Sequence, residues 1–429
     1  MTTQIPGPPA WQTVWQFTRD PLQMFSDARV TWGDVVCFSA LGYAFYQVTS
    51  PTLAHDVLTH DDLQMSVMME HPFVGQGLAN NIGDSWKRQR RLLQPHFHQK
   101  AVQHFADQMV QATHALSEQW AAQDQHDVLP GLVRLNHQIL GATVLDLDFN
   151  QHPQMLAALR TIRRYLNRRF QAIITVPEAI PTPRNRAFKR AVALWDQAVN
   201  ERIALAGDEP TLLAMLRHAE DPKTGYRMTD AQLRDEVNTI FFNGYEDPGA
   251  TVTWALYLLS QHPQVQSALY QQIHDVLGDR QATVADLRSL PLLDNVIKET
   301  MRLYPTTWAV IRDARGAVPL GDYVIPDGAS VQVTIFLIHR HPDYWEQADS
   351  FDPSRFDRAY PSQAYMPYGA GPRQCIGRAF ADMQMRLILV TLLQRYRFDF
   401  VPQDVQINAM ASLRPNDGLR LRLYPRSDR

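Results

Sequence analysis

The stretch YMPYGAGPRQCIGRAF, residues 365–380, holds one of the two cysteines in this chain of 429 residues. Glycines at positions 369, 371 and 377 frame Cys375, and Arg373 precedes it by two positions. The following apolar pattern predicts a helix over about 376–396, so Cys375 would lie near unsatisfied backbone N–H groups and the positive end of a helix dipole, which favour a thiolate. Glycine lets a flat, bulky group approach the backbone, and an arginine offers donors to a carboxylate.

Thiolate, flat partner and carboxylate together indicate haem, because a cysteine thiolate is one of the axial ligands of haem iron. Two other interpretations fit the same residues: a structural cysteine at a helix start, and a redox thiol beside a cationic side chain. The second cysteine, Cys37, is expected to be a small buried hydrophobic residue. The pair offers no disulfide framework, CxxC motif or Cys/His cluster with zinc-ligand spacing.

Composition and charge exclude several classes of protein. Hydrophobic residues make up 45% of the chain, enough for a large core, and the formal net charge of -3 is unlike the basic balance of a nucleic-acid-binding domain. The N-terminus lacks the features of a secretory signal, and no apolar run approaches the roughly 18 residues of a membrane span. We therefore expect a soluble, cytoplasmic protein without a nucleic-acid partner or a membrane span.

The pattern of apolar and turn residues predicts a mainly α-helical fold with small β-sheets, in a single domain over residues 1–429. Residues DVVCFSALGYAFYQVTSP, from Asp34, predict an antiparallel hairpin that turns at Leu41-Gly42, within a β-rich portion at about 30–60. Helical periodicity dominates a core at about 80–310, and short strands return at about 321–337 and near the C-terminus. The clearest helical segments lie near 85–122, 186–205, 231–260, 263–277, 292–303 and 376–396.

The segment at 231–260 predicts a long buried helix that opens with a capping box, Thr229-x-x-Gln232. Its middle is apolar on most faces, yet it contains Glu246 and Asp247. Ionised side chains in a buried helix cost several kcal/mol unless they are paired, hydrated or functional. Pro248 deletes a backbone hydrogen bond, so the helix should kink there.

The cysteine stretch resembles the haem-binding loop of the cytochromes P-450, the heme-thiolate monooxygenases. The pattern of that family is Phe-x-x-Gly-x-Arg-x-Cys-x-Gly, matched here by Tyr368, Gly371, Arg373, Cys375 and Gly377, with tyrosine in place of the usual phenylalanine. The resemblance implies the cytochrome P-450 fold, haem b (iron protoporphyrin IX) as cofactor, and Cys375 as the axial ligand of the iron. Gly369, in the same loop, would then also contact the haem.

Further motifs extend the resemblance over nearly the whole chain. Glu299 and Arg302 in KETMRLYP, with Arg355 in FDPSRF, resemble the Glu-Arg-Arg structural triad of the family, although Glu-x-x-Arg alone is an ordinary helical ion pair. The stretch GDSWKRQRRLLQPHF resembles the C-helix, which implies that Trp86 and Arg90, four apart on one helical face, reach a haem propionate. Without the resemblance it would be a solvated basic helix.

Arg312, in WAVIRDARG, falls where the family often has another propionate-binding arginine.

The central helix departs from the family pattern Ala-Gly-x-Glu/Asp-Thr, in which the acid and the alcohol organise water and help to deliver protons. Here the sequence is NGYEDP, so Glu246 matches the acid and Asp247 replaces the threonine. Adjacent carboxyl groups in a dry pocket resist double ionisation, so Asp247 would serve as a proton relay. The alternatives are a substrate anchor, and a carboxylate that only binds water and backbone at the helix bend.

The resemblance also implies a substrate pocket and separate partners. A small hydrophobic substrate would bind above the haem, against a loop rich in methionine, the central helix, the segment after Pro305 and the turn at 412–413. The expected lining residues are Met68, Met69, Phe241, Phe242, Asn243, Trp308, Val310 and Leu413. The arginine-rich stretch at 160–169 is either a solvated face or a site for an acidic substrate or an acyl-carrier protein.

No dinucleotide-binding glycine motif and no second set of cysteines is present, so electrons should come from a separate ferredoxin- or flavodoxin-type donor. Lys87, Arg88, Arg91 and Arg378 form the predicted docking patch.

The predicted function is a haem-dependent monooxygenase that uses molecular oxygen to hydroxylate or epoxidise a hydrophobic small molecule. The alternatives are a peroxygenase, or an oxidative coupling or rearrangement enzyme of the same family. A haem-binding sensor without turnover is the alternative from a different class, and the costly buried acids Glu246 and Asp247 argue against it.

Overall fold

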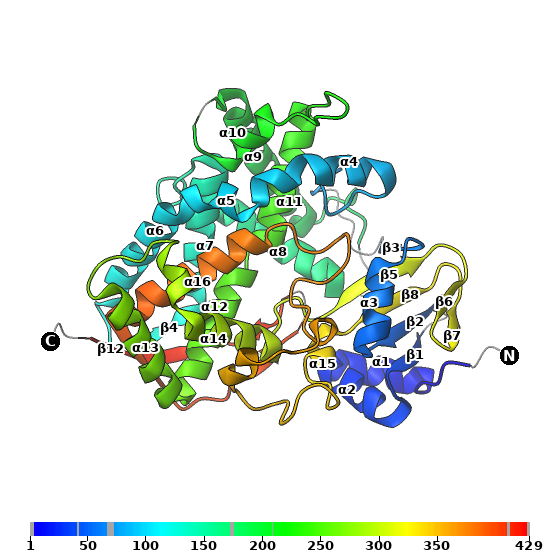
Figure 1. Cartoon of the computed structure of the whole chain (residues 1–429). Coiled ribbons are helices and arrows are strands. Elements are labelled where there is room, and N and C mark those ends of the chain that lie inside the picture. The colour runs from blue at the N-terminus through cyan, green and yellow to red at the C-terminus, as the bar shows by residue number, and fades with distance from the viewer. Residues whose placement is uncertain are drawn as a thin grey trace. The chain divides into compact units, whose positions relative to one another are not determined.

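The computed structural model describes residues 4–40, 43–66, 73–171, 176–207, 209–409 and 412–426. These residues belong to two compact units, each described separately below. Unit 1 comprises Met1–Glu70, Asn295–Ile376 and Ser412–Arg414, and unit 2 comprises His71–Asp294, Gly377–Ala411 and Pro415–Arg429. Both units are drawn in Figure 1, coloured from blue at the N-terminus to red at the C-terminus.

Unit 1 is built around a five-stranded sheet with the order β1-β2-β8-β5-β3. The β2–β8 pair is parallel and the other pairs are antiparallel. The elements are α1 (Ala10–Arg19), α2 (Pro21–Trp32), β1 (Val35–Ala40), β2 (Tyr43–Val48), α3 (Pro51–Thr59), β3 (Leu63–Met65), β5 (Val310–Ala314), β6 (Val318–Leu320), β7 (Tyr323–Ile325), β8 (Ser330–Val333), α15 (Ile335–Ile338), η5 (Pro353–Asp357) and η6 (Ser362–Ala364).

The β1–β2 pair confirms the predicted hairpin, although its turn at Leu41-Gly42 lies outside the described residues. Side chains alternate across a strand, so the two faces of this sheet bury different sets. One face packs Val36 and Phe38 against Met24 and Phe25 of α2. Cys37 points the other way and is half-buried, and burial raises the pKa of its thiol, so Cys37 is a protonated packing residue at neutral pH.

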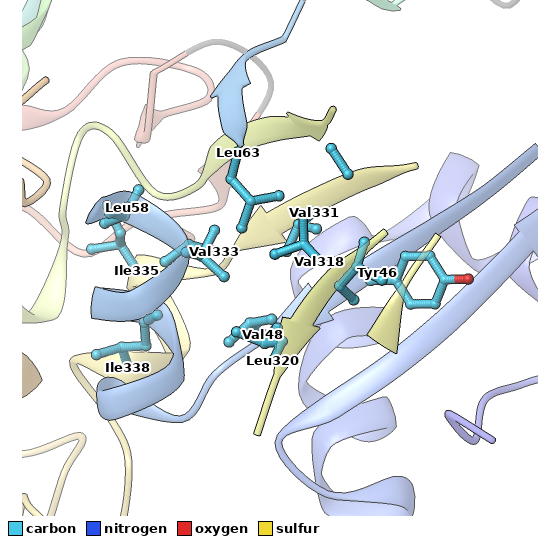
Figure 2. Packing of buried hydrophobic residues seen from close by; sticks show 14 of the residues in the cluster. Tyr46, Val48, Leu58, Leu63, Val318, Leu320, Val331, Val333, Ile335 and Ile338 are labelled. Atoms are coloured by element: carbon cyan, nitrogen blue, oxygen red, sulfur yellow. The ribbon is translucent and has the colours of Figure 1, made fainter. Parts of the chain in front are cut away.

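The other face of the sheet carries the main core of unit 1. Figure 2 shows Leu58 of α3 beside Val333 of β8 and Ile335, with Leu63 and Val331 next to them. These side chains are almost completely removed from solvent, and each stabilises the fold by roughly 1.5–3 kcal/mol through burial. This apolar layer holds β5, which carries Arg312, and α3, which contacts the cysteine loop at Gly371.

A buried ion-pair cluster joins α14 (Pro291–Leu303) to the segment around η5. Arg302 donates to both carboxylate oxygens of Glu299 at 2.6 and 2.7 Å, and Arg355 donates to the same carboxylate at 3.2 Å. Neither Glu299 nor Arg302 is exposed to solvent. The remaining donors of Arg302 bind three backbone carbonyl groups, those of His339, Ala348 and Ser350. The predicted triad residues therefore meet, and they tie three loop segments to one helix.

Unit 2 is mainly helical, with a three-stranded sheet of order β4-β12-β9. In Figure 1 the orange helix α16 runs beside α6 and α12. The elements are α4 (Gly83–Leu93), η2 (Gln94–Phe97), α5 (Gln99–Val102), η3 (Gln103–Phe105), α6 (Ala106–Trp120), β4 (Gln125–Asp127), α7 (Val128–Leu145), α8 (Pro153–Gln171), α9 (Pro183–Leu205), α10 (Leu212–His218), α11 (Asp230–Gly244), α12 (Asp247–Gln261), α13 (Pro263–Leu277), η4 (Asp286–Ser289), α16 (Arg378–Arg395), β9 (Tyr396–Phe400), β10 (Ile407–Asn408) and β12 (Arg420–Pro425).

Two elements are shared between the units. The first turn of α14 belongs to unit 2 and the rest to unit 1, whereas in β11 (Arg414–Pro415) Arg414 belongs to unit 1 and Pro415 to unit 2. No helix among the described residues is both long and apolar enough to cross a membrane.

The predicted single helix over 231–260 is wrong in one respect: the structure has two helices, α11 and α12, rather than one kinked helix. The capping box at Thr229 and Gln232 starts α11 as predicted. The interruption covers Tyr245 and Glu246, and Pro248 is the second residue of the helix that follows. The predicted helix over 85–122 is likewise divided, because Pro95 and two short 3-10 turns separate α4 from α6.

We predict that breaking the buried Glu299 ion pair lowers the free energy of unfolding much more than breaking an exposed ion pair. Arg302→Gln should lower the free energy of unfolding by about 3–5 kcal/mol, because it leaves a buried carboxylate with too few partners. The matched control, Arg227→Gln, breaks the exposed pair with Glu220 and should cost at most about 1 kcal/mol. Urea unfolding of the two variants compares them, and equal losses would contradict the analysis.

Candidate functional site

The cysteine loop of unit 1 is a tight turn that presents an exposed thiol. The Cys375 N–H donates to the Tyr368 carbonyl at 3.0 Å, and Gly369 and Gly371 have φ angles of 69° and 70°. A Cβ on Gly371 would lie 2.5 Å from the carbonyl oxygen of Leu58 in α3, so only glycine fits there. Cys375 is exposed, unlike Cys37, so a ligand can reach its sulfur. The helix α16 starts at Arg378, three residues later than Cys375.

Buried His339 anchors this loop to the Glu299 cluster. Its Nε2 accepts the N–H of Met366 at 2.8 Å, and its Nδ1 lies 3.2 Å from the Met301 carbonyl. Burial lowers the pKa of His339 to about 3, so the ring is neutral and donates from Nδ1. Since Arg302 also binds the His339 carbonyl, the cluster and the cysteine loop form one connected framework. Sequence reasoning missed His339, because no motif marked it.

Arg312 lies on β5 of the same unit and is almost fully buried. Its Nη1 contacts the sulfur of Met65 at 3.4 Å and the Ile311 carbonyl at 3.0 Å. Burial lowers the pKa of Arg312 to about 10, so the side chain is still charged at neutral pH. No carboxylate among the described residues forms an ion pair with it, although a buried, unpaired charge is costly. An anionic group of a ligand would remove that cost.

Trp86 and Arg90 lie one turn apart on α4 in unit 2, as their spacing predicted. Trp86 is buried, and Arg90 donates from Nε to Gln94 at 2.8 Å. Of the predicted docking patch, which also uses α4, only some of the cations are exposed to a partner. Arg91 binds buried Asp221 at 2.6 Å, whereas Lys87 and Arg88 are exposed, with Arg88 over the ring of Tyr226.

Arg378, the fourth residue predicted for that patch, pairs with Asp382 at 3.6 Å, and its side chain is largely exposed.

The interruption between α11 and α12 carries the two predicted catalytic acids. Asp247 is the first residue of α12, and Glu246 occupies the N-cap position without a side-chain capping hydrogen bond. The Glu246 carboxylate lies 3.8 Å from Nη2 of Arg163 on α8, with both side chains largely buried. Arg163 also donates to the Phe242 carbonyl at 3.1 Å. One residue of the predicted basic helix is therefore turned inward to the acid of the central helix.

The comparisons with known proteins agree on one family. The family model described as Cytochrome P450 matches residues 5–421. The chain belongs to the cytochrome P450 family. Its relatives include pentalenene oxygenase of Streptomyces avermitilis, 29% identical over 96% of this chain and 95% of that protein, and cyclooctat-9-en-7-ol 5-monooxygenase of Streptomyces melanosporofaciens, 29% identical over 77% and 74%.

Among solved structures, the crystal structure of the cytochrome P450DA heme domain has a TM-score of 0.92 and 25% identity, and the match covers 100% of this chain and 99% of that one. The predicted fold class, mainly α with small sheets, is confirmed. The predicted enzyme class, a heme-thiolate monooxygenase, is confirmed by the family and its named members.

The residues present fit the haem that the P450 family implies. Cys375 offers an exposed thiol on a loop that glycines and His339 hold in place, and a thiolate is a suitable ligand for iron. Arg312 offers a buried cation without a carboxylate partner among the described residues, which suits a propionate.

Two acids of α11 hold the loop before α4, a role that sequence reasoning missed. Asp235 accepts the N–H of Gln76 at 2.8 Å, and Glu236 accepts the N–H of Leu78 at 3.2 Å and the side-chain amide of Gln89. A Cβ on Gly77 would lie 1.9 Å from Oγ1 of Thr239, so the glycine permits this close approach. Glu236 is buried, and burial raises its pKa to about 8. The two acids thus position α4, which carries Trp86.

A buried histidine next to the interruption does not add a proton donor. His137 of α7 lies against the ring of Tyr245, with 4.0 Å between ring centroids. Burial, with Arg160 and Arg163 nearby, lowers the pKa of His137 to about 3. Burial likewise raises the pKa of Tyr245 to about 12. Both side chains are therefore neutral near pH 7. His137 is not an imidazolium at this pH, so it cannot act as a general acid.

The arginine-rich helix α8 has two faces. Arg160, Arg164 and Arg168 are exposed at a spacing of four residues, as a solvated or partner-binding stripe would be. Arg169 pairs with Glu178 at 3.8 Å, and Arg163 faces Glu246.

The predicted pocket residues fall in several environments. Phe241 is fully buried against Trp195 and Phe149, which favours a core role over pocket lining. Trp308 packs against Phe25, with 5.9 Å between the ring centroids, in the core that α2 forms with β1. Phe242 lies partly exposed beneath Arg163.

The other predicted pocket residues are distributed as follows. Asn243 is exposed and binds the Thr239 carbonyl of its own helix. Val310 is half-buried at the start of β5, and buried Leu413 donates its N–H to Thr306 at 2.9 Å. Met68 and Met69 lie outside the described residues.

Glu236 predicts a pH-dependent stability. Its pKa is 4.5 in a free side chain and about 8 in the fold, so the folded state holds the proton more tightly and stability falls as pH rises between these values. Glu236→Gln cannot ionise and should flatten this fall, which makes it more stable than the parent by a few kcal/mol at about pH 8 and similar at about pH 5. Denaturant unfolding across this range tests it, with Glu220→Gln as the exposed control. Parallel curves for the parent and Glu236→Gln would refute the assignment.

Proposed function

We propose that the protein is a P450 monooxygenase that inserts oxygen into a small, apolar, cyclic molecule, with electrons from a separate protein. The observation that carries the proposal is the exposed Cys375 thiol on its rigid loop, in a chain that matches the P450 family from residue 5 to 421. When bound, the haem supplies dioxygen activation at an iron to which a cysteine thiolate donates electron density.

The residues proposed to hold the haem come from three segments. Cys375 binds the iron, and Gly369, Tyr368, Arg373 and Gly377 of the same loop surround it. Arg312 binds a propionate, which the lack of a carboxylate partner among the described residues supports. Trp86 and Arg90 bind a propionate from α4, in agreement with their placement one turn apart.

Glu246 and Asp247 are proposed as the acids that supply protons. The Arg163 guanidinium lies beside the Glu246 carboxylate and gives it a cationic neighbour on α8. Its nitrogen–oxygen distance of 3.8 Å is longer than a strong charge-assisted hydrogen bond, so the pair can open without a large cost. Asp247 stands next to it at the start of α12, where the family has an alcohol, and takes over the relay at that position.

The substrate class follows from the relatives, whose names refer to pentalenene and cyclooctat-9-en-7-ol. We propose an apolar cyclic substrate of this kind, hydroxylated or epoxidised. Electrons come from an acidic ferredoxin or flavodoxin that docks on exposed cations, Lys87 and Arg88 on α4 and Arg378 on α16. Arg91 is excluded from this role because it is engaged by Asp221.

The two cysteines give a matched test of the proposal. Cys375→Ser should abolish the red-shifted absorption band that the reduced parent protein gives with carbon monoxide, because serine cannot supply a thiolate. Cys37→Ser should keep the band, since Cys37 is a half-buried packing residue. A parent protein that binds no porphyrin, or a band that survives in Cys375→Ser, would overturn the proposal.

The role of Asp247 is tested by two substitutions. As a relay, Asp247 predicts that Asp247→Asn diverts most of the reducing equivalents to hydrogen peroxide, while Asp247→Thr restores an exchangeable hydroxyl and most of the coupling. Substrate affinity, measured from the spin-state change in the visible spectrum, should be the same in both variants. Affinity that falls in both variants with coupling intact would identify a substrate anchor instead. Product formation by the parent with peroxide alone would favour the peroxygenase alternative.

A further inference from the structure

The interruption of the central helix leaves backbone carbonyl groups that need donors. In a continuous helix the carbonyl of Gly244 would accept from the residue four positions later, but that residue is Pro248, which has no N–H. A buried carbonyl without a partner is unfavourable, so the chain must supply a donor from elsewhere. Tyr245 lies between the two helices, so its carbonyl also stands at the break in the helical hydrogen-bond pattern.

Asn136 of α7 supplies this donor. Its side-chain Nδ2 donates to the Gly244 carbonyl at 2.5 Å and to the Tyr245 carbonyl at 2.8 Å. The two acceptors use both hydrogens of the amide group, and Asn136 is completely buried. A leucine of similar size would fill the same volume but would leave both carbonyls without this donor.

Gln384 of α16 fixes the orientation of Asn136. Its Nε2 donates to Oδ1 of Asn136 at 2.7 Å, and Gln384 is also completely buried. A flipped Asn136 amide would turn its oxygen toward two carbonyl oxygens and its donors toward another donor, so only one orientation is compatible with these partners. The bonds therefore form a directed chain from α16 through α7 to the interruption.

The backbone around the interruption is shaped for close contact with α7. A Cβ on Gly249 would lie 3.0 Å from the Leu132 carbonyl oxygen, and one on Gly244 would lie 3.3 Å from Cδ1 of Leu140. Leu132 and Leu140 flank Asn136 on α7, one on each side. The glycines on both sides of the interruption thus bring it within reach of the short asparagine side chain.

We propose that Asn136, held by Gln384, is a positioning residue that fixes the interruption in the central helix and thereby aims Glu246 and Asp247. The inference rests on the proposed proton-supplying role of these two acids. Arg163 donates to the Phe242 carbonyl in the last turn of α11, and Asn136 donates to the Gly244 and Tyr245 carbonyls. These bonds fix the backbone from which the two acid side chains extend. The role assigned to Asn136 is to hold the backbone through the Gly244 and Tyr245 carbonyls, and it is not a role in proton transfer.

The first measurement is backbone hydrogen exchange in the holoenzyme, which needs no substrate. In Asn136→Leu, exchange of amides at 244–250 should rise by about tenfold or more, because the carbonyls that define the interruption lose their donor. The matched control is Asn238→Leu, which removes another fully buried asparagine, in α11, that binds the Phe73 carbonyl and Trp195. It should leave exchange at 244–250 unchanged. Equal exchange in the parent and Asn136→Leu would overturn the proposal.

A double-mutant cycle shows whether Asn136 acts through the missing N–H. Pro248→Ala restores an amide that can donate to the Gly244 carbonyl, so the effect of Asn136→Leu on exchange should be much smaller in this background. The same increase with and without Pro248→Ala would contradict the proposal. Gln384→Leu, which keeps Asn136 but frees its amide to turn, replaces Asn136→Leu if the latter yields no folded holoenzyme, with the same expected direction and a smaller size.

The second measurement separates this inference from the proposed function. With a ferredoxin and its reductase, Asn136→Leu should release a several-fold larger share of reducing equivalents as peroxide than the parent. The pH dependence of this peroxide release should also differ between the variant and the parent. The carbon monoxide band should be the same in both. The positioning role would be overturned if Asn136→Leu raised amide exchange at 244–250 but left peroxide release and its pH dependence unchanged. A parent without the red-shifted band fails the proposed function instead, and the exchange data remain interpretable.

Discussion

The missing N–H of Pro248 is the constraint from which the arrangement of the central helix follows. It opens the helix inside a region where every polar backbone group needs a partner, and the side chains of α7 and α8 provide the partners. Glu246 leaves the regular helix at this point with a backbone that is no longer helical, φ -125° and ψ -34°. An acid on a continuous buried helix would point wherever the helical repeat directed it. Here its direction is set by Asn136 and Arg163.

Charge burial is managed in three different ways in this molecule. Glu299 is neutralised by two arginines and further hydrogen bonds, which makes a rigid joint. Glu236 accepts hydrogen bonds from a backbone N–H and from an amide side chain, both neutral donors, and its raised pKa lets it hold a proton near neutral pH. Arg312 retains its charge although it is buried, and lacks a carboxylate partner among the described residues. Of the three, only Arg312 calls for an additional, anionic group, which is why it supports a cofactor site whereas Glu299 supports only the fold.

Sequence reasoning succeeded where the chemistry is local and failed where it depends on distant segments. The cysteine loop, the hairpin at β1–β2 and the capping box of α11 are each contained in a few consecutive residues. Asn136 is separated from Gly244 by 108 residues and from Gln384 by 248, and nothing in either neighbourhood marks it. Pro248 did indicate an irregularity in the helix, but a proline by itself predicts only a lost backbone hydrogen bond. Whether the helix bends or divides depends on which side chains can satisfy the carbonyls, and that requires the fold.

The Arg302–Glu299 and Arg163–Glu246 pairs suit different purposes. Arg302 grips Glu299 with two short bonds of 2.6 and 2.7 Å and neither side chain is exposed, so separating them would leave two buried charges. Arg163 stands 3.8 Å from Glu246, and both side chains keep some exposure, at 14% and 12%. A group that passes protons has to change partners in every cycle, and a pair that loose can do so at small cost. Arg163 also keeps its bond to the Phe242 carbonyl and lies over the Phe242 ring, so it would stay in place while Glu246 moves. In the proposed relay, the Glu246 side chain would turn while the backbone of the interruption stays fixed.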